Sequence, residues 1–257
     1  MARVYAIISG KGGVGKTTST INLGTALNQL GEDVVIVDAN LSTPNIGIHL
    51  GAPIVPITLN HVLNNQANLE DAIYEHESGT KIMPASLSLK ESEKINYKKF
   101  TETIKKLKKI TNHVLIDSAA GLGEEARAAI NAADEIIIIT NPEMSAVTDA
   151  LKTIKLAEET NKPITGVIIT RCQGKKLEMS FANIKDMLEV PILGIIPEED
   201  SIKESQVMKN PVIITHPKSR ATRTYLMTSR KLLGHDVTFE IPNQGFFSKL
   251  LTAFNGR

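Results

Sequence analysis

A glycine-rich stretch near the N-terminus has the residue types and spacing that bind phosphate groups. It fits the pattern Gly-x4-Gly-Lys-Thr and consists of Gly10, Lys11, Gly12, Gly13, Val14, Gly15, Lys16, Thr17 and Thr18. Glycines allow the backbone to wrap closely around phosphates, with consecutive N–H groups pointing inward. In such a loop Lys16 is expected to reach the β- and γ-phosphates, while the Thr17 hydroxyl binds Mg²⁺. The stretch therefore predicts a nucleoside triphosphate site.

A phosphate loop needs a strand before it and a helix after it, and the sequence supplies both. An apolar run at residues 4–8 precedes the loop, and a helix-like segment at 17–30 follows it. The helix would add the positive end of its dipole to the site. The alternative is a glycine-rich turn that matches the pattern by chance, and the flanking elements count against it.

Short β-branched runs alternate with helical segments along the whole chain. Strands are expected at residues 4–8, 34–38, 81–83, 114–117, 135–140, 164–170 and 192–195, and helices at 17–30, 97–110, 124–132, 146–160, 177–188 and 218–233. Runs such as the four isoleucines at 136–139 lack polar alternation, which suits strands buried on both faces. We therefore expect an α/β fold with a doubly wound, mostly parallel sheet and helices on both faces, Rossmann-like as in P-loop NTPases.

Composition bounds the class of protein. The 257 residues suit one large α/β domain, and a net charge of +1 provides no global field for nucleic acid. Cys172 is the single cysteine, so no internal disulfide is possible. The N-terminus lacks a signal-peptide pattern, and no apolar stretch approaches the ~20 residues of a spanning helix. We expect a cytoplasmic protein.

Lys11 narrows the interpretation of the phosphate loop. With this second lysine, the sequence Lys-Gly-Gly-Val-Gly-Lys-Thr resembles the deviant Walker A ATPases, the MinD/ParA superfamily. The resemblance implies that ATP and Mg²⁺ are the cofactors and that two ATP-bound subunits form a homodimer. In that dimer Lys11 would cross the interface and contact the nucleotide of the other subunit.

The second predicted strand ends in Asp38-Ala39-Asn40, and strand ends are where open α/β sheets place ligand-binding groups. In the family, the first Asp of an Asp-x-Asp switch supports Mg²⁺ through its water shell, and the second orients the attacking water. Asn40 departs from this pattern. An amide can hydrogen-bond water but cannot take a proton, so we expect hydrolysis that is slower by a few kcal/mol of barrier, not absent. Backbone groups or another side chain could instead position the water, and a scaffold that binds ATP without hydrolysing it is a further alternative.

The strand at 114–117 resembles a Walker B strand that runs into a second switch. The resemblance implies that Asp117 holds the Mg²⁺ shell and that the Gly121 N–H senses the γ-phosphate. The family reads adenine near the ends of the sixth and seventh strands, partly through an Asn-Arg pair. This chain has Thr170 before Arg171, so backbone contacts around Pro197 and Glu198 could carry base recognition instead.

The C-terminal segment 245–257 has its own composition. At 100° per residue, one arc of about 140° would contain five apolar side chains, Phe246, Phe247, Leu250, Leu251 and Phe254. Lys249 faces the other way, and no acid occurs from residue 241 onward. This pattern is typical of a short interfacial helix that prefers anionic lipid. A terminal helix docked on the protein's own core is the alternative. The expected division is an ATPase domain at 1–235, a linker at 236–244 and a membrane-targeting helix at 245–257.

MinD proteins end in a similar helix and ParA proteins do not, so the tail favours a MinD-type ATPase peripheral on the inner face of the cell membrane. Such an enzyme would position cell division or another polar assembly together with an ATPase-activating or division-regulating protein. The alternative is a ParA-type ATPase that partitions DNA. Residues 203–231 carry seven basic side chains and one acid, a net charge of +6, which could hold lipid or DNA phosphates. Relatives that transfer electrons or insert metals use paired cysteines, which one cysteine cannot supply.

Overall fold

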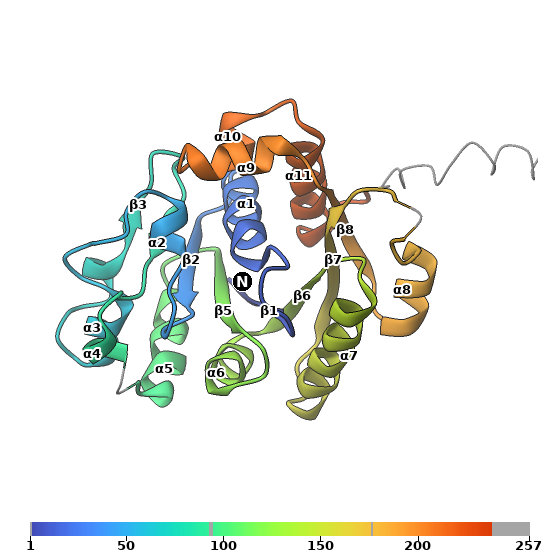
Figure 1. Cartoon of the computed structure of the whole chain (residues 1–257). Helices are drawn as coiled ribbons and strands as arrows, with labels where there is room; N and C mark the ends of the chain where they lie inside the picture. The colour runs from blue at the N-terminus through green and yellow to red at the C-terminus, as the bar shows by residue number, and fades with distance from the viewer. Residues whose placement is uncertain (1, 93–94, 176, 238–257) are drawn as a thin grey trace, which may run out of the picture.

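The computed structural model describes residues 2–92, 95–175 and 177–237. Within them one eight-stranded sheet has the order β3-β4-β2-β5-β1-β6-β7-β8 (Figure 1). The strands are β1 (Arg3–Ser9), β2 (Val34–Ala39), β3 (Tyr74–Glu75), β4 (Lys81–Met83), β5 (His113–Ala120), β6 (Glu135–Thr140), β7 (Ile164–Cys172) and β8 (Ile192–Pro197). All neighbouring strands are parallel apart from the β3–β4 pair. The expected doubly wound, mostly parallel sheet is confirmed.

Helices cover both faces of this sheet, as Figure 1 shows. One face packs against α1 (Lys16–Gln29), α2 (Ile46–His49), α10 (Val212–Thr215) and α11 (Arg220–Leu232). The opposite face packs against α3 (Leu59–Leu63), α5 (Tyr97–Leu107), α6 (Glu124–Ala132), α7 (Met144–Glu159) and α8 (Phe181–Leu188). The remaining short elements are η1 (Glu70–Ala72), α4 (Leu89–Ser92) and α9 (Asp200–Val207).

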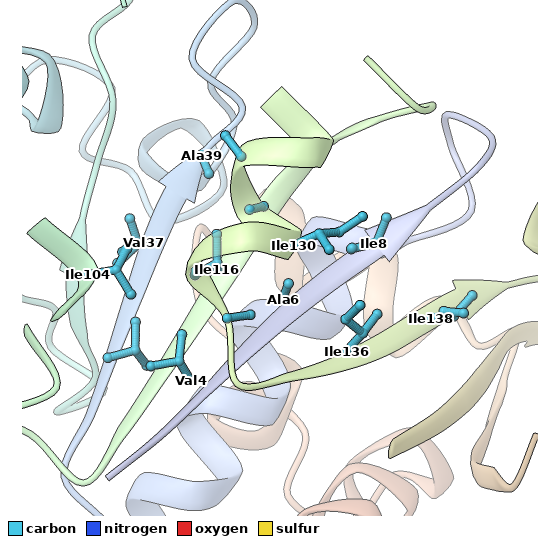
Figure 2. Close-up of a cluster of buried hydrophobic side chains, with 14 of the residues drawn as sticks. Val4, Ala6, Ile8, Val37, Ala39, Ile104, Ile116, Ile130, Ile136 and Ile138 are labelled. Atoms are coloured by element: carbon cyan, nitrogen blue, oxygen red, sulfur yellow. The ribbon is translucent and has the colours of Figure 1, made fainter. Parts of the chain in front are cut away.

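Each central strand divides its side chains between two hydrophobic cores. In β1, Val4, Ala6 and Ile8 belong to the cluster beneath α5 and α6, whereas Tyr5 and Ile7 belong to the cluster beneath α1. Figure 2 shows the first cluster, with Ile104 of α5 and Ile130 of α6 turned towards the strands. Because both faces are buried, the strands need apolar residues at every position, which explains their unbroken β-branched runs.

The differences from the expected elements have local causes. The helix expected from residue 177 begins at Phe181, after Ser180 caps it by accepting a hydrogen bond from the Asn183 N–H. The last helix likewise begins after Ser219, which accepts from the Thr222 N–H, and it is followed by Gly234 with φ 85°. Strand β3, η1 and the short helices α2, α3, α4, α9 and α10 were not predicted, and most of them span only two to five residues, too few to show a period.

The register of β2 against β5 places the loops of the site side by side. Asp38 pairs with Asp117 and Ala39 with Ser118, so both carboxylates stand at the same edge of the sheet. Strand β1, which leads into the glycine-rich loop, pairs with β5 on its other side. Three loops far apart in the sequence therefore meet at the carboxyl ends of adjacent strands, where open α/β sheets bind ligands.

The core predicts a stability effect on α5. Ile104→Ala removes a fully buried side chain and should lower the free energy of unfolding by about 2–5 kcal/mol, because a cavity remains. Lys105→Ala changes the next residue, which is exposed, and should stay within about 0.5 kcal/mol of the original chain. Urea denaturation followed by circular dichroism measures both. A loss below 1 kcal/mol for Ile104→Ala would contradict the packing described here.

Candidate functional site

The glycine-rich loop has the backbone geometry of an anion cradle. Gly13 and Gly15 have φ of 77° and 86°, the left-handed region that favours glycine. Gly15 is also the N-cap of α1 and provides no side chain to bond the first N–H groups of that helix. Those N–H groups and the positive end of the helix dipole therefore remain available for an anion.

Thr170 on β7 is hydrogen-bonded to the glycine-rich loop. The Thr170 hydroxyl lies 2.5 Å from the Val14 carbonyl oxygen and 3.0 Å from that of Thr140, so its proton is shared between two acceptors. Thr170 is buried. From the sequence alone, Thr170 is considered only because it stands where the family has an Asn that contacts adenine. Nothing in its local sequence points to the phosphate loop.

Asp117 is the centre of a cluster of α1 side chains. Its buried carboxylate accepts hydrogen bonds from Lys16 Nζ at 2.9 Å, Thr17 Oγ1 at 2.6 Å and Thr20 Oγ1 at 3.2 Å. Lys16 Nζ also donates to the backbone oxygen of Ser118. The residues expected to bind phosphate and magnesium thus meet on one carboxylate. Thr20 was not predicted, although its position one turn after Lys16 on the same helix was a usable signal.

Asp38 adds a second buried carboxylate beside Asp117. It accepts backbone hydrogen bonds from Asn45 and Ile46 at 2.9 Å and from Asn40 at 3.2 Å. Burial, followed by the neighbouring Asp117 charge, raises the pKa of Asp38 to about 7, and the three N–H groups oppose this rise. Two acids in this arrangement have more negative charge than Lys16 alone offsets.

These groups fit Mg²⁺. The Thr17 hydroxyl and the two carboxylates are hard oxygen donors, and a cation beside them would offset the charge of two acids that are buried together. Mg²⁺ usually takes one or two carboxylates and completes its shell with water and phosphate, so a larger protein cage is not needed. Consistently, no group of three or more His, Cys, Asp or Glu that could hold a metal occurs in the described part of the chain.

Asn40 lies in the loop after β2, and both the nitrogen and the oxygen of its amide are bonded to Thr43. Its Nδ2 donates to the Thr43 backbone oxygen at 2.5 Å, and its Oδ1 accepts from the Thr43 hydroxyl at 3.0 Å. The first of these bonds requires an amide, because a carboxylate has no proton to donate. Sequence reasoning did not identify Thr43 as the partner of Asn40.

Two further predicted residues have partners within the chain. The Gly121 N–H donates to the Ser9 carbonyl oxygen at 2.9 Å, and Gly121 has φ of 85°. Lys11 Nζ lies 3.2 Å from both Glu143 Oε2 and Ser145 Oγ, with 41% of its side chain exposed. The two Lys11 contacts are exposed, so Lys11 can exchange them for a contact to another molecule.

The residues expected near a base lie together at the ends of β7 and β8. Cys172 pairs with Pro197 across these strands, and the Glu198 N–H donates to the Cys172 oxygen at 3.0 Å. Arg171 is exposed and has φ of 55°. Contact of these residues with a base stays a prediction.

The basic residues at 203–231 are partly neutralised. Lys203 pairs with Asp200 at 3.2 Å, and Arg220 pairs with Glu199 at 2.7 Å. Arg223 and Arg230, both exposed on α11, have no ion pair among the residues that the structure describes.

The expected membrane contacts, Phe246, Phe247, Lys249, Leu250, Leu251 and Phe254, lie outside the described residues. Among residues that are described, none of the helices combines the length and apolar character needed to cross a bilayer.

Comparison with known proteins places the chain among phosphate-loop proteins of one family. The family model described as ParA, NUBPL iron-transfer P-loop NTPase, matches residues 1–233. An uncharacterized ATP-binding protein of Methanocaldococcus jannaschii is 34% identical over 100% of this chain and 98% of its own length.

Two solved structures of MinD are also similar. MinD of Pyrococcus horikoshii, complexed with Mg-ADP, is 35% identical with a TM-score of 0.86, and the match covers 90% of this chain and 96% of that one. MinD of Aquifex aeolicus in a MinC:MinD complex is 32% identical with a TM-score of 0.85, over 93% of this chain and 99% of that one. Together with the phosphate loop, Lys11 and the paired aspartates, these matches establish that the chain belongs to the MinD/ParA family of P-loop NTPases.

Proposed function

We propose that this protein is a MinD-type ATPase that binds ATP and Mg²⁺, dimerises on ATP and binds the membrane through its C-terminal segment. Its role would be the spatial regulation of cell division or of another polar assembly. The observation that carries the proposal is the cluster of Lys16 and Thr17 on Asp117 beside Asp38, in a chain that is similar to MinD over nine-tenths of its length.

The residues take the following parts. Backbone N–H groups of the glycine-rich loop bind the phosphates, and Lys16 leaves Asp117 to contact their β- and γ-oxygens. Mg²⁺, when bound, neutralises the charge that develops on the transferred phosphoryl group. Thr17, Asp117 and Asp38 would hold the ion, which would compensate the buried charge of both acids.

Dimerisation depends on Lys11. In the single chain Lys11 is held by Glu143 and Ser145, and its half-exposed position lets it exchange these partners for the nucleotide of a second subunit. The ionic contact that it gives up is solvent-exposed and therefore weak.

Membrane binding depends on the segment 245–257. Five apolar side chains would each contribute at most ~1.5–3 kcal/mol on full burial, and ordering a short helix offsets much of this. One tail would therefore bind weakly and reversibly. Two tails on an ATP-bound dimer raise the avidity by about 10²–10⁴, which makes membrane binding depend on nucleotide.

A regulatory partner is supported by the MinC:MinD complex of the Aquifex aeolicus relative. Iron transfer, named in the family description, is less well supported. Cluster binding needs several thiolates, whereas this chain has one cysteine, and burial raises the pKa of its thiol far above the usual range.

The second candidate function is ParA-type binding to DNA, which Arg223 and Arg230 favour because neither has an ion pair within the described part of the chain. It predicts ATP-dependent DNA binding that weakens steeply with salt and survives removal of the tail.

Vesicle co-sedimentation tests the proposal. The full chain should pellet with anionic vesicles in ATP, but much less in ADP or without nucleotide, because only the dimer presents two tails. A chain ending at Asp236 should stay in the supernatant. The Lys11→Ala variant should pellet no more in ATP than in ADP. Pelleting that ignores nucleotide would refute the switch, and the absence of pelleting combined with ATP-dependent DNA binding would favour the second function.

Asn40→Asp tests the expected slow hydrolysis. A carboxylate that orients the water should raise steady-state phosphate release by about tenfold or more, the scale of one electrostatic catalytic contact. Ala39→Gly, a change at the neighbouring residue, serves as the control. An unchanged rate for Asn40→Asp would mean that other groups position the water.

Thr170→Val tests the support of the phosphate loop. This nearly isosteric change removes the bond to the Val14 carbonyl and should weaken ATP binding by about 3–10-fold, as expected for one lost hydrogen bond. Thr165→Val removes a hydroxyl bonded to Glu135 at the other end of β7 and should leave ATP affinity unchanged. Titration calorimetry measures both, and equal affinities for the two variants would contradict the role of Thr170.

A further inference from the structure

The loop after β2 is bonded to α6 through one carboxylate. Glu125 Oε1 accepts two hydrogen bonds from Ser42, from the backbone N–H at 2.8 Å and from the hydroxyl at 2.6 Å. Both are charge-assisted and short, and both are exposed to solvent, where water competes for the same groups. The two residues are 83 positions apart in the sequence.

The two hydrogen bonds join the Asn40 loop to the helix that follows the Gly121 loop, and both loops are expected to respond to nucleotide. Ser42 lies two residues after Asn40, in a loop whose far end, Asn45 and Ile46, donates to Asp38 Oδ2. Glu125 lies in the first turn of α6, the helix that follows the Gly121 loop. The loops leave adjacent strands, β2 and β5, and the link joins them at their outer side.

The Asn40 loop is a closed unit that Glu125 can hold as a whole. Leu41 is buried, and Asn40 and Thr43 bond to each other through side chains and backbone. A shift of Ser42 therefore carries Asn40 with it. Glu125 itself does not contact Asn40 or the phosphate loop, so any effect on the reaction passes through Ser42.

We propose that Glu125 is a positioning residue that couples the Asn40 loop to α6, so that the groups flanking the γ-phosphate move together. The proposal rests on the ATPase function proposed above. A γ-phosphate that draws the Gly121 N–H from Ser9 shifts the start of α6, and Glu125 transmits this shift to Asn40 through Ser42. The positions of Asn40 and the Gly121 N–H affect the rate of the chemical step more than the affinity for ATP.

Hydrogen exchange of the full chain without nucleotide or lipid tests the link itself. Glu125→Ala should speed exchange at the Ser42 amide and its neighbours by about tenfold, because the backbone bond is lost. Glu125→Gln retains an acceptor oxygen and should restore most of the protection. Glu124→Ala is the matched control: it removes a charge from the same first turn, and Glu124 has no hydrogen bond or ion pair within the described residues.

Steady-state kinetics tests the positioning role. Glu125→Ala should lower kcat by about 5–10-fold with KM for ATP changed less than twofold, Glu125→Gln should recover most of kcat, and Glu124→Ala should match the original chain. Thermal unfolding of all three variants checks that none of them is globally destabilised.

The outcomes separate the proposal from the function it rests on. Unchanged exchange in Glu125→Ala, or faster exchange with unchanged kcat, would overturn the positioning role. A loss of kcat that Glu125→Gln does not recover, or that Glu124→Ala shares, would also overturn it. If the original chain hydrolysed no ATP, the proposed function would fail by itself, and the exchange result would still decide whether Glu125 restrains the loop.

Discussion

Two buried carboxylates at the ends of adjacent parallel strands are the constraint on which the rest of the structure depends. Asp38 and Asp117 lie opposite each other in register, and neither is exposed to solvent. Since the pKa of Asp38 is higher in the folded chain than its ordinary 3.8, ionising it costs folding free energy, and this cost grows as the pH rises from about 4 to about 7. Lys16 offsets part of the charge, and a bound Mg²⁺ ion would offset the rest. The site therefore joins an anion cradle in the glycine-rich loop to a pair of acids that suit a cation.

Several polar groups of the surrounding loops are hydrogen-bonded within the chain to partners that a ligand could replace. Lys16 donates a hydrogen bond to Asp117, Lys11 donates one to Glu143, and the Gly121 N–H donates one to the Ser9 carbonyl oxygen. Each of these groups is one that a nucleotide, or a second subunit carrying one, would attract. Because several of the bonds gained with a ligand would replace bonds already present, binding would change the positions of the loops as well as fill a space. This is the physical basis on which a P-loop ATPase can act as a switch.

Asn40 departs from the Asp-x-Asp pattern of the family, and the loop around it has polar contacts of its own. Asn40 donates to the Thr43 backbone, which an aspartate could not do, and Ser42 is bonded to Glu125. The loop is therefore closed by polar contacts that suit its own sequence. A slow reaction and a tightly held loop are compatible, because phosphoryl transfer depends more on position than on a strong base.

Local features follow from the sequence alone: the phosphate loop between a strand and a helix, the isoleucine-rich strands of a sheet covered on both faces, and the end of the last helix at Gly234. These depend on near neighbours, whose spacing and backbone preferences a linear pattern records. Only the tertiary structure decided which distant groups meet. Lys16 and Asp117 are 101 residues apart, and their contact follows from a strand order in which β5 lies between β1 and β2. That order is selected by the packing of helices on both faces, and neither periodicity nor composition reports it.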